Sequence, residues 1–104
     1  MRAANVFVHG IWAGRLDEME LGHKYHFVYR SGYDGPAVSL TMPTIASEYS
    51  FDRFPPFFDG LLPEGGMLEG LLKQNKIDRA DCFSQLVAVG GDLVGAVTVQ
   101  EAAE

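Results

Sequence analysis

Asn5-Val6-Phe7-Val8-His9 and Ile11-Trp12-Ala13-Gly14-Arg15-Leu16 decide the fold, and only Gly10 separates the two stretches. The first alternates loosely between apolar and polar side chains, as a half-buried strand does. A tight turn at His9-Gly10 would join the two stretches as an antiparallel hairpin. The chain therefore begins as β-sheet.

Two further strands are predicted beyond this hairpin. Residues Tyr25 to Arg30 place an aromatic side chain at every second position, a clear period of two. Turn-forming residues fill Ser31 to Pro36. The alternation resumes from Ala37 to Met42 and stops at Pro43, whereas Thr44 to Asp52 resembles a loop.

The second half of the chain changes to helical spacing. Pro55-Pro56 can open a helix, because the first turn does not need the proline N–H. Pairs of large apolar residues then recur four residues apart, and Asp78 is suited to capping the start of a third helix that Gly90-Gly91 closes. The buried faces expected are Phe57, Phe58, Leu61 and Leu62 before Pro63; Met67, Leu68, Leu71 and Leu72 after a flexible joint at Gly65-Gly66; and Phe83, Leu86 and Val87.

A last strand is predicted from Val94 to Val99, followed by a frayed polar tail from Gln100 to Glu104. Strands joined by hairpins pair antiparallel, and clustered helices define an α+β domain. We therefore expect one domain over residues 1–104, ordered from about 5 to 99. Its small antiparallel sheet, open or barrel-like, would have three short helices inserted before the last strand.

Composition excludes several classes of function. The 104 residues carry a formal net charge of −6 and no run of Lys or Arg, which disfavours binding to nucleic acid or to an anionic membrane. The single cysteine excludes an internal disulfide and fits a reducing cytoplasm. No apolar stretch has the length of a signal peptide or a membrane span.

Phosphate and metal sites are not supported by the motifs. The glycine-rich stretch Gly90 to Val97 lacks the Lys and Ser or Thr of a phosphate-binding loop, so a helix cap followed by a strand is the better interpretation. His23 and His26 are three residues apart, which places them on opposite faces of a strand. We expect no metal and no cofactor.

Catalytic groups are equally sparse. Cys82 stands near the start of a helix, which lowers a thiol pKa, but Asp81 beside it opposes the thiolate, and a structural cysteine is the better interpretation. The acidic residues Asp17, Glu18 and Glu20 are expected in a solvated turn. A small enzyme that uses Cys82 or the histidines remains the third-ranked hypothesis, behind two binding functions.

Apolar surface is what remains. Two proline-bounded helices meet at an exposed corner, and not every apolar residue there can face inward. Excess apolar surface on a small domain marks a site for a partner. We expect the partner-binding residues in this corner, namely Leu62, Pro63, Glu64, Gly65, Gly66 and Met67, although the adjacent glycines offer no side chain to plug a cleft.

Three motifs follow one another in the second half of the chain: Phe57-Phe58-Asp59-Gly60-Leu61-Leu62-Pro63-Glu64, Asp81-Cys82-Phe83-Ser84-Gln85-Leu86 and Gly91-Asp92-Leu93-Val94-Gly95-Ala96-Val97. Shorter ones precede them at Val6-Phe7-Val8, Gly14-Arg15-Leu16 and Ser39-Leu40-Thr41-Met42-Pro43. Together, and in this order, they resemble the N-terminal domain of HipA-type kinases, and the resemblance covers about Asn5 to Val99.

The resemblance implies a function that the residues alone do not give. The chain is similar to the stand-alone, HipS-like form of the family, which is found in toxin–antitoxin systems with a HipT-like serine/threonine kinase and a HipB-like DNA-binding protein. It would then be a non-catalytic antitoxin that docks on the kinase and inhibits it, with the HipB-like protein as a further member of the complex. The alternative is a separately encoded structural or activating part of a HipA-type kinase.

Overall fold

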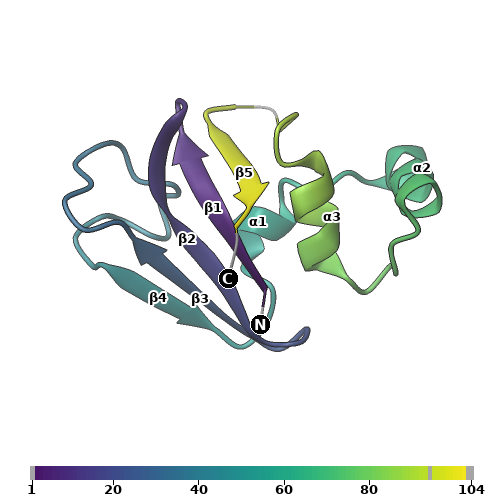
Figure 1. Cartoon of the computed structure of the whole chain (residues 1–104), viewed down its shortest axis with the longest axis horizontal. Coiled ribbons are helices and arrows are strands. Elements are labelled where there is room, and N and C mark those ends of the chain that lie inside the picture. Colours follow the sequence, from purple (N-terminus) through teal and green to yellow (C-terminus); the bar gives the residue numbers. More distant parts are fainter. Residues whose placement is uncertain (1, 94, 103–104) are drawn as a thin grey trace.

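The computed structural model describes residues 2–93 and 95–102. It contains a five-stranded antiparallel sheet of order β4-β3-β2-β1-β5, with the helices gathered to one side (Figure 1). The α+β class with the helices before the last strand is confirmed. The elements in chain order are β1 (Arg2–Val8), β2 (Ile11–Glu20), β3 (Lys24–Tyr29), β4 (Glu48–Phe51), α1 (Pro56–Asp59), α2 (Gly65–Asn75), α3 (Cys82–Val89) and β5 (Val97–Glu101).

The predicted hairpin is present between β1 and β2. His9 and Gly10 form its turn with φ angles of 50° and 78°, and only the second of these left-handed positions is held by a glycine, which adopts it without strain. The partners of the consecutive residues Val6 and Phe7 are Gly14 and Trp12, so Ala13 is an extra residue that forms a bulge in β2. β3 lies antiparallel to β2, so the first three strands are where the alternation placed them.

The fourth strand was predicted in the wrong place. Residues 37–42 contribute one isolated bridge, Ser39 to Met42, and are otherwise loop. The strand beside β3 is instead β4, within the stretch expected to be a loop. Val38 and Met42 are apolar because they anchor the loop in the core, at 5% and 1% exposure, and not because they alternate across a sheet.

The core lies between the sheet and the helices. Side chains from β1, β2, β3 and β5 form one buried cluster with residues of α1 and α3. Phe58 of α1 is fully buried, and its ring lies 6.2 Å from that of Phe27 on β3. α3 contributes Phe83 and Leu86. Phe57 and Leu61 pack against this cluster while partly exposed, so the expectation that they belong to the core holds in part.

The sheet is open and does not close into a barrel. β4 and β5 are its two edges among the described strands. The edge at β5 is partly covered by the end of α3, because the Val99 N–H donates to the Gly90 carbonyl at 2.9 Å. A Cβ built on Gly90 would lie 2.0 Å from the Val99 carbonyl oxygen, so this contact requires a glycine.

Several helix boundaries differ from those expected. α1 is a single turn, and the Gly65-Gly66 joint is in fact the first turn of α2. The cap of α3 is Asp81, whose carboxylate accepts from the Ser84 N–H, whereas Asp78 accepts from the Ala80 N–H in the preceding turn. The spacing of apolar residues predicts that a helix forms, but it does not fix the residues at which the helix begins and ends.

The first and the last strand of the chain are longer than expected. β1 begins at Arg2, and Gln100 and Glu101 belong to β5, so this part of the predicted tail is not frayed. Val94, which was predicted to start the last strand, lies outside the described residues, as do residues 103 and 104. Within residues 2–93 and 95–102, every helix is too short or too polar to cross a lipid bilayer.

Candidate partner-binding surface

The predicted corner, Leu62 to Met67, forms the link between α1 and α2. Leu62 and Pro63 are half-buried, and the side chains from Glu64 onward are exposed, with Met67 at 78%. Gly65 has a φ of +59°, which a residue with a Cβ would adopt only under strain. The corner is therefore contiguous, outward-facing and bent by a glycine.

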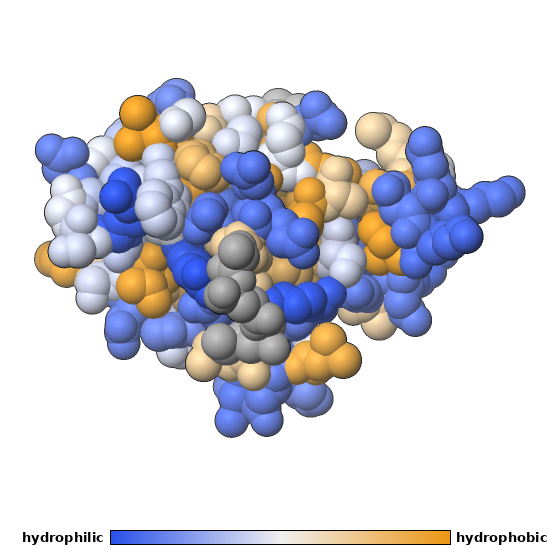
Figure 2. Space-filling view, in the orientation of Figure 1, coloured by the Kyte–Doolittle hydropathy of each residue, from blue (hydrophilic) through white to orange (hydrophobic). Residues whose placement is uncertain are grey.

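α2 stands away from the rest of the molecule (Figure 1). Its one buried residue is Leu72, at 9% exposure, and Leu68 and Leu71 are half-buried. In the space-filling view, the protrusion formed by α2 is hydrophilic on its outer side and apolar toward the body (Figure 2). With Met67 on its first turn, α2 extends the apolar corner into an ordered helix.

The link after α2 is held by local contacts. Lys76 closes the helix in the left-handed conformation, and its N–H donates to the Leu72 carbonyl. Arg79 forms an ion pair with Glu69 of α2, although both side chains are largely exposed. The protrusion is therefore an ordered element, held to the body by one buried leucine and by its two connecting segments.

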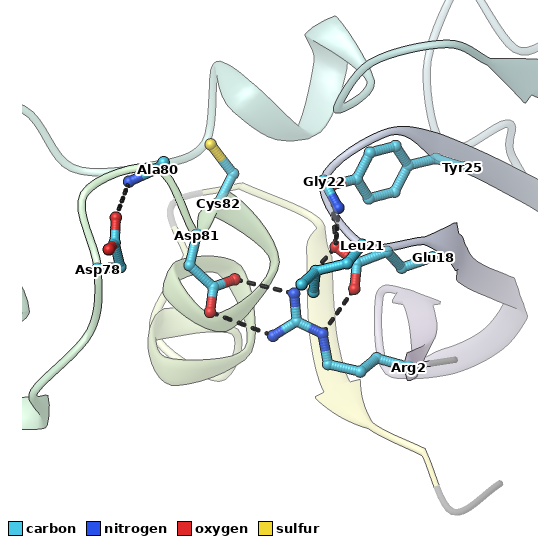
Figure 3. Close-up of a pocket in the computed structure, with 9 residues that line it drawn as sticks. All are labelled: Arg2, Glu18, Leu21, Gly22, Tyr25, Asp78, Ala80, Asp81 and Cys82. Atoms are coloured by element: carbon cyan, nitrogen blue, oxygen red, sulfur yellow. Dashed lines mark hydrogen bonds and ion pairs between the residues drawn. The ribbon is translucent and has the colours of Figure 1, made fainter.

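A second feature, missed in the sequence, is a charged cluster around Arg2 (Figure 3). The Arg2 guanidinium donates to both Glu18 oxygens, at 2.6 and 2.9 Å, and to both Asp81 oxygens, at 2.9 and 3.2 Å. It also donates to the Ser84 hydroxyl at 2.8 Å and lies 4.8 Å from the centre of the Phe83 ring. One side chain thus ties β1 to β2 and to α3.

Glu18 is not in a solvated turn, as was predicted, but is buried at 3% exposure on β2. Burial alone would raise its pKa, but hydrogen bonds from Arg2, Gly22 N–H and the Tyr25 hydroxyl outweigh it and hold the pKa below its usual value. Its position in the sequence did indicate burial, because Gly14, Leu16 and Glu18 are two residues apart and therefore share the inward face of β2.

A cavity of about 330 Å³ adjoins this cluster. On its wall, the Arg2 guanidinium already bonds to the Glu18 and Asp81 carboxylates, and the Asp78 carboxylate accepts from the Ala80 N–H, so these groups hold the fold together. It is lined by Arg2, Glu18, Leu21, Gly22, Tyr25, Asp78, Ala80, Asp81 and Cys82.

Cys82 and the histidines do not assemble a reactive centre. Burial raises the pKa of the Cys82 thiol, and the carboxylates of Asp59 and Asp81 raise it further, so the nucleophilic thiolate is disfavoured. His23 is exposed in the turn after β2, and the His26 ring lies 3.7 Å from Glu48. Across the described ranges, no three His, Cys, Asp or Glu side chains are grouped as metal ligands.

Together these features describe a small α+β domain whose strands and α3 are tied by the ion pairs of Arg2, and whose helix α2 protrudes from the body. The chain belongs to the HipA N-terminal domain family, whose model matches residues 4–100. It is 35% identical over 101 residues to an uncharacterized protein of Haemophilus influenzae, an alignment that covers 97% of this chain and 93% of that protein. It is also similar to a solved structure of the N-terminal domain of HipA toxin, with a TM-score of 0.77 and 30% identity, over 100% of this chain and 95% of that one.

Proposed function

We propose that the chain is a HipS-like antitoxin that binds a HipT-like serine/threonine kinase and lowers its activity, with no chemistry of its own. The observation that carries the proposal is the family match over residues 4–100, which accounts for nearly the whole described fold. The Haemophilus relative supports a separately encoded domain, because the alignment covers 93% of its length.

The contact with the kinase is assigned to Leu62–Met67 and the start of α2. Met67 is 78% exposed, and the half-buried Leu68 and Leu71 continue the apolar surface along the helix. Burying such side chains in a partner removes apolar area from water, which is the main favourable term in association. Because Gly65 and Gly66 have no side chains, we expect backbone atoms and Met67 to make this contact, without a large side chain that enters a cleft of the kinase.

The net charge of −6 separates this chain from the DNA-binding part of such a system. A surface that neutralises phosphates needs clustered Lys and Arg. In a ternary complex, contact with DNA would therefore fall to a HipB-like protein.

A second function is favoured by one observation: the similar solved structure is itself described as a domain of a toxin. The chain could thus complete a HipA-type kinase as a structural or activating part. Both functions require binding, so the direction of the change in kinase activity separates them.

The test is a titration of a HipT-like kinase with the purified chain, in which complex formation and ATP-dependent phosphorylation are followed together. Saturable binding with falling activity is expected. Rising activity would support the second function, and an absence of binding would contradict both.

Two matched variants of α2 locate the contact. Met67→Gln replaces an exposed apolar side chain, and we expect it to weaken binding roughly tenfold. Lys73→Gln introduces the same side chain at another exposed position of α2 and should change affinity by less than about threefold. Equal affinities for the two variants would remove Met67 from the interface.

A further inference from the structure

Helix α2 docks on the body through side chains that lie outside the main core. Leu72 is its one buried residue, and Leu68, Leu71 and the nearby Ile77 are half-buried. None of these four side chains belongs to the buried cluster that joins the sheet to α1 and α3, or to the partly buried residues packed against that cluster. α2 contacts mainly α3 and stands away from the strands (Figure 1). Its apolar contact is therefore a small cluster separate from the core.

The sequence of α2 is a poor helix former without that contact. An isolated helix shorter than about 12–15 residues is marginal in water even when it is rich in alanine. α2 has 11 residues, and three of them are Gly65, Gly66 and Gly70. A glycine inside a helix weakens it relative to alanine, because its backbone loses more freedom on folding. The side chain of Glu64 gives the first turn no capping hydrogen bond. The helix is therefore stable only while Leu72 is docked.

The polar contact of α2 offers little resistance to its opening, whereas α3 is firmly attached to the sheet. Glu69 of α2 pairs with Arg79, but each side chain is 61% exposed, and solvent-exposed ion pairs contribute little stability. α3 is tied to β1 and β2 by the hydrogen bonds of Arg2, and its end is tied to β5 by the Val99 N–H, which donates to the Gly90 carbonyl. α3 should therefore stay in place when α2 leaves it.

We infer that α2 is a separately folding unit, which leaves α3 and loses its helix in one local opening while the sheet, α1 and α3 stay folded. The docked helix is the ground state, and the open state exposes Leu68, Leu71 and Leu72 to water. Local openings of this kind need much less free energy than global unfolding. The inference goes beyond the proposed function, because it concerns the free chain. It also bears on the surface at Leu62–Met67, since Met67 lies on the first turn of α2 and is held there only while the helix is docked.

The test is native-state hydrogen exchange of the free chain, followed amide by amide by nuclear magnetic resonance. The amides of residues 69–75, within α2, should exchange at least about a hundredfold faster than the paired amides of β2 and β3, once intrinsic rates are divided out. Low concentrations of urea should hardly change the α2 rates, because the opening exposes little surface, but should raise the strand rates steeply. Equal protection with equal urea dependence would mean that α2 opens only when the whole domain unfolds, and the inference would be overturned.

A substitution in the sheet separates local from global opening. Val6→Ala shortens a fully buried side chain of β1, and it should speed the exchange of strand amides at least about tenfold, because it destabilises the whole fold. The α2 rates should stay within about twofold of those of the parent chain, since the docked and the open state share the altered core. Equal acceleration of α2 and the strands would contradict a separate unit. If Val6→Ala does not fold, the urea dependence of the parent chain decides.

Two matched glycine substitutions test whether the helix itself is lost on opening. Gly70→Ala adds a methyl group inside α2 where open space surrounds it, and should slow exchange in α2 about two- to fivefold, because alanine stabilises the helix that opening removes. Gly91→Ala makes the same change after α3, also toward open space, and should leave the α2 rates unchanged. If Gly70→Ala and Gly91→Ala give the same α2 rates, the helix does not melt when it opens, and the inference is overturned.

The outcomes are independent of the proposed function, because every measurement uses the free chain. A kinase titration without binding would remove the proposed function and leave the exchange pattern of α2 as it is. Amides of α2 that exchange as fast as those of an unfolded chain would show that the docked helix is not the ground state, which would also overturn the inference. Fast, urea-insensitive exchange confined to α2 would support it, whatever the chain binds.

Discussion

Replacing Arg2 with methionine should lower the free energy of unfolding of this domain more than the loss of any other cation on the sheet. The substitution keeps an apolar stem against Phe83 but removes the guanidinium that bonds to Glu18 and Asp81. Glu18 would then be a carboxylate at 3% exposure without its cation. Breaking such a buried pair costs about 3–5 kcal/mol.

The magnitude must be reduced for solvent, since the Arg2 side chain is 31% exposed and that of Asp81 is 29% exposed. We therefore expect a loss of about 2–3 kcal/mol in the free energy of unfolding. For a domain of this size, each kcal/mol shifts Tm by roughly 4–8 °C, so Tm should fall by roughly 10–20 °C. Urea unfolding and thermal melting, both followed by far-ultraviolet circular dichroism, measure the loss.

The control is Arg15→Met, which breaks another ion pair on the same sheet. Arg15 Nε lies 2.7 Å from Asp17 Oδ1, but the side chains are 36% and 17% exposed. Neither carboxylate nor guanidinium of this pair is buried as Glu18 is, and a pair that solvent reaches is worth less than about 1 kcal/mol. If Arg2→Met and Arg15→Met destabilise the domain equally, the cluster around Arg2 does not stabilise the fold as argued.

The stabilisation by the ion pairs of Arg2 should depend on pH. Burial opposes the charged forms of Glu18 and Asp81, but their hydrogen bonds from Arg2 and other donors prevail, so both folded-state pKa values lie below the unfolded ones. The stabilisation is thus complete above the unfolded values of about 4 and is lost as pH falls through the folded values. The stability gap between the parent chain and Arg2→Met should be widest near pH 7 and should narrow below about pH 4. A gap that stayed constant down to pH 3 would indicate lost packing instead of lost ion pairs.

Three further predictions concern local geometry. Gly90→Ala should destabilise the domain by more than about 2 kcal/mol, because a Cβ there would lie 2.0 Å from the Val99 carbonyl oxygen, whereas Gly91→Ala, with open space around its Cβ, should shift urea unfolding by less than about 1 kcal/mol. Gly70→Ala, inside α2 and also facing open space, should stabilise the helix by about 0.5–1 kcal/mol, and a lower midpoint of unfolding would contradict this. The Cys82 thiol, whose pKa is raised by burial and then by nearby carboxylates, should react with iodoacetamide at pH 8 more slowly in the folded chain than in urea, and equal rates would show the site to be open.

Local alternation predicted the first three strands because each has one face in the core. It failed at residues 37–42, where Val38 and Met42 are buried through a turn pinned by Tyr29 from another strand. The partners of that turn are set by tertiary packing, which no window of neighbouring residues contains. β4 was not predicted because it is a four-residue edge strand between turn-forming residues, which is too short to show a clear alternation.

The corner at Leu62–Met67 could be located from its prolines, glycines and excess of large apolar residues. The cluster around Arg2 could not, because Arg2 and Asp81 lie at nearly opposite ends of the chain and meet only after β1 and α3 have packed. Charged residues are usually solvated, so the default interpretation of Glu18 was reasonable and wrong. Its place on the inward face of β2 was the one available sign.

The arrangement separates folding from binding in a way that experiments can use. The interactions that secure the fold, Arg2 with its carboxylates and Gly90 against β5, lie within the packed body. Met67 contributes little to the core, since it is 78% exposed. A polar substitution at Met67 should therefore leave Tm nearly unchanged while it weakens binding to the kinase. A Met67 variant that lowered both Tm and the affinity for the kinase would mean that this side chain stabilises the chain itself, and the case for a partner at Met67 would fail.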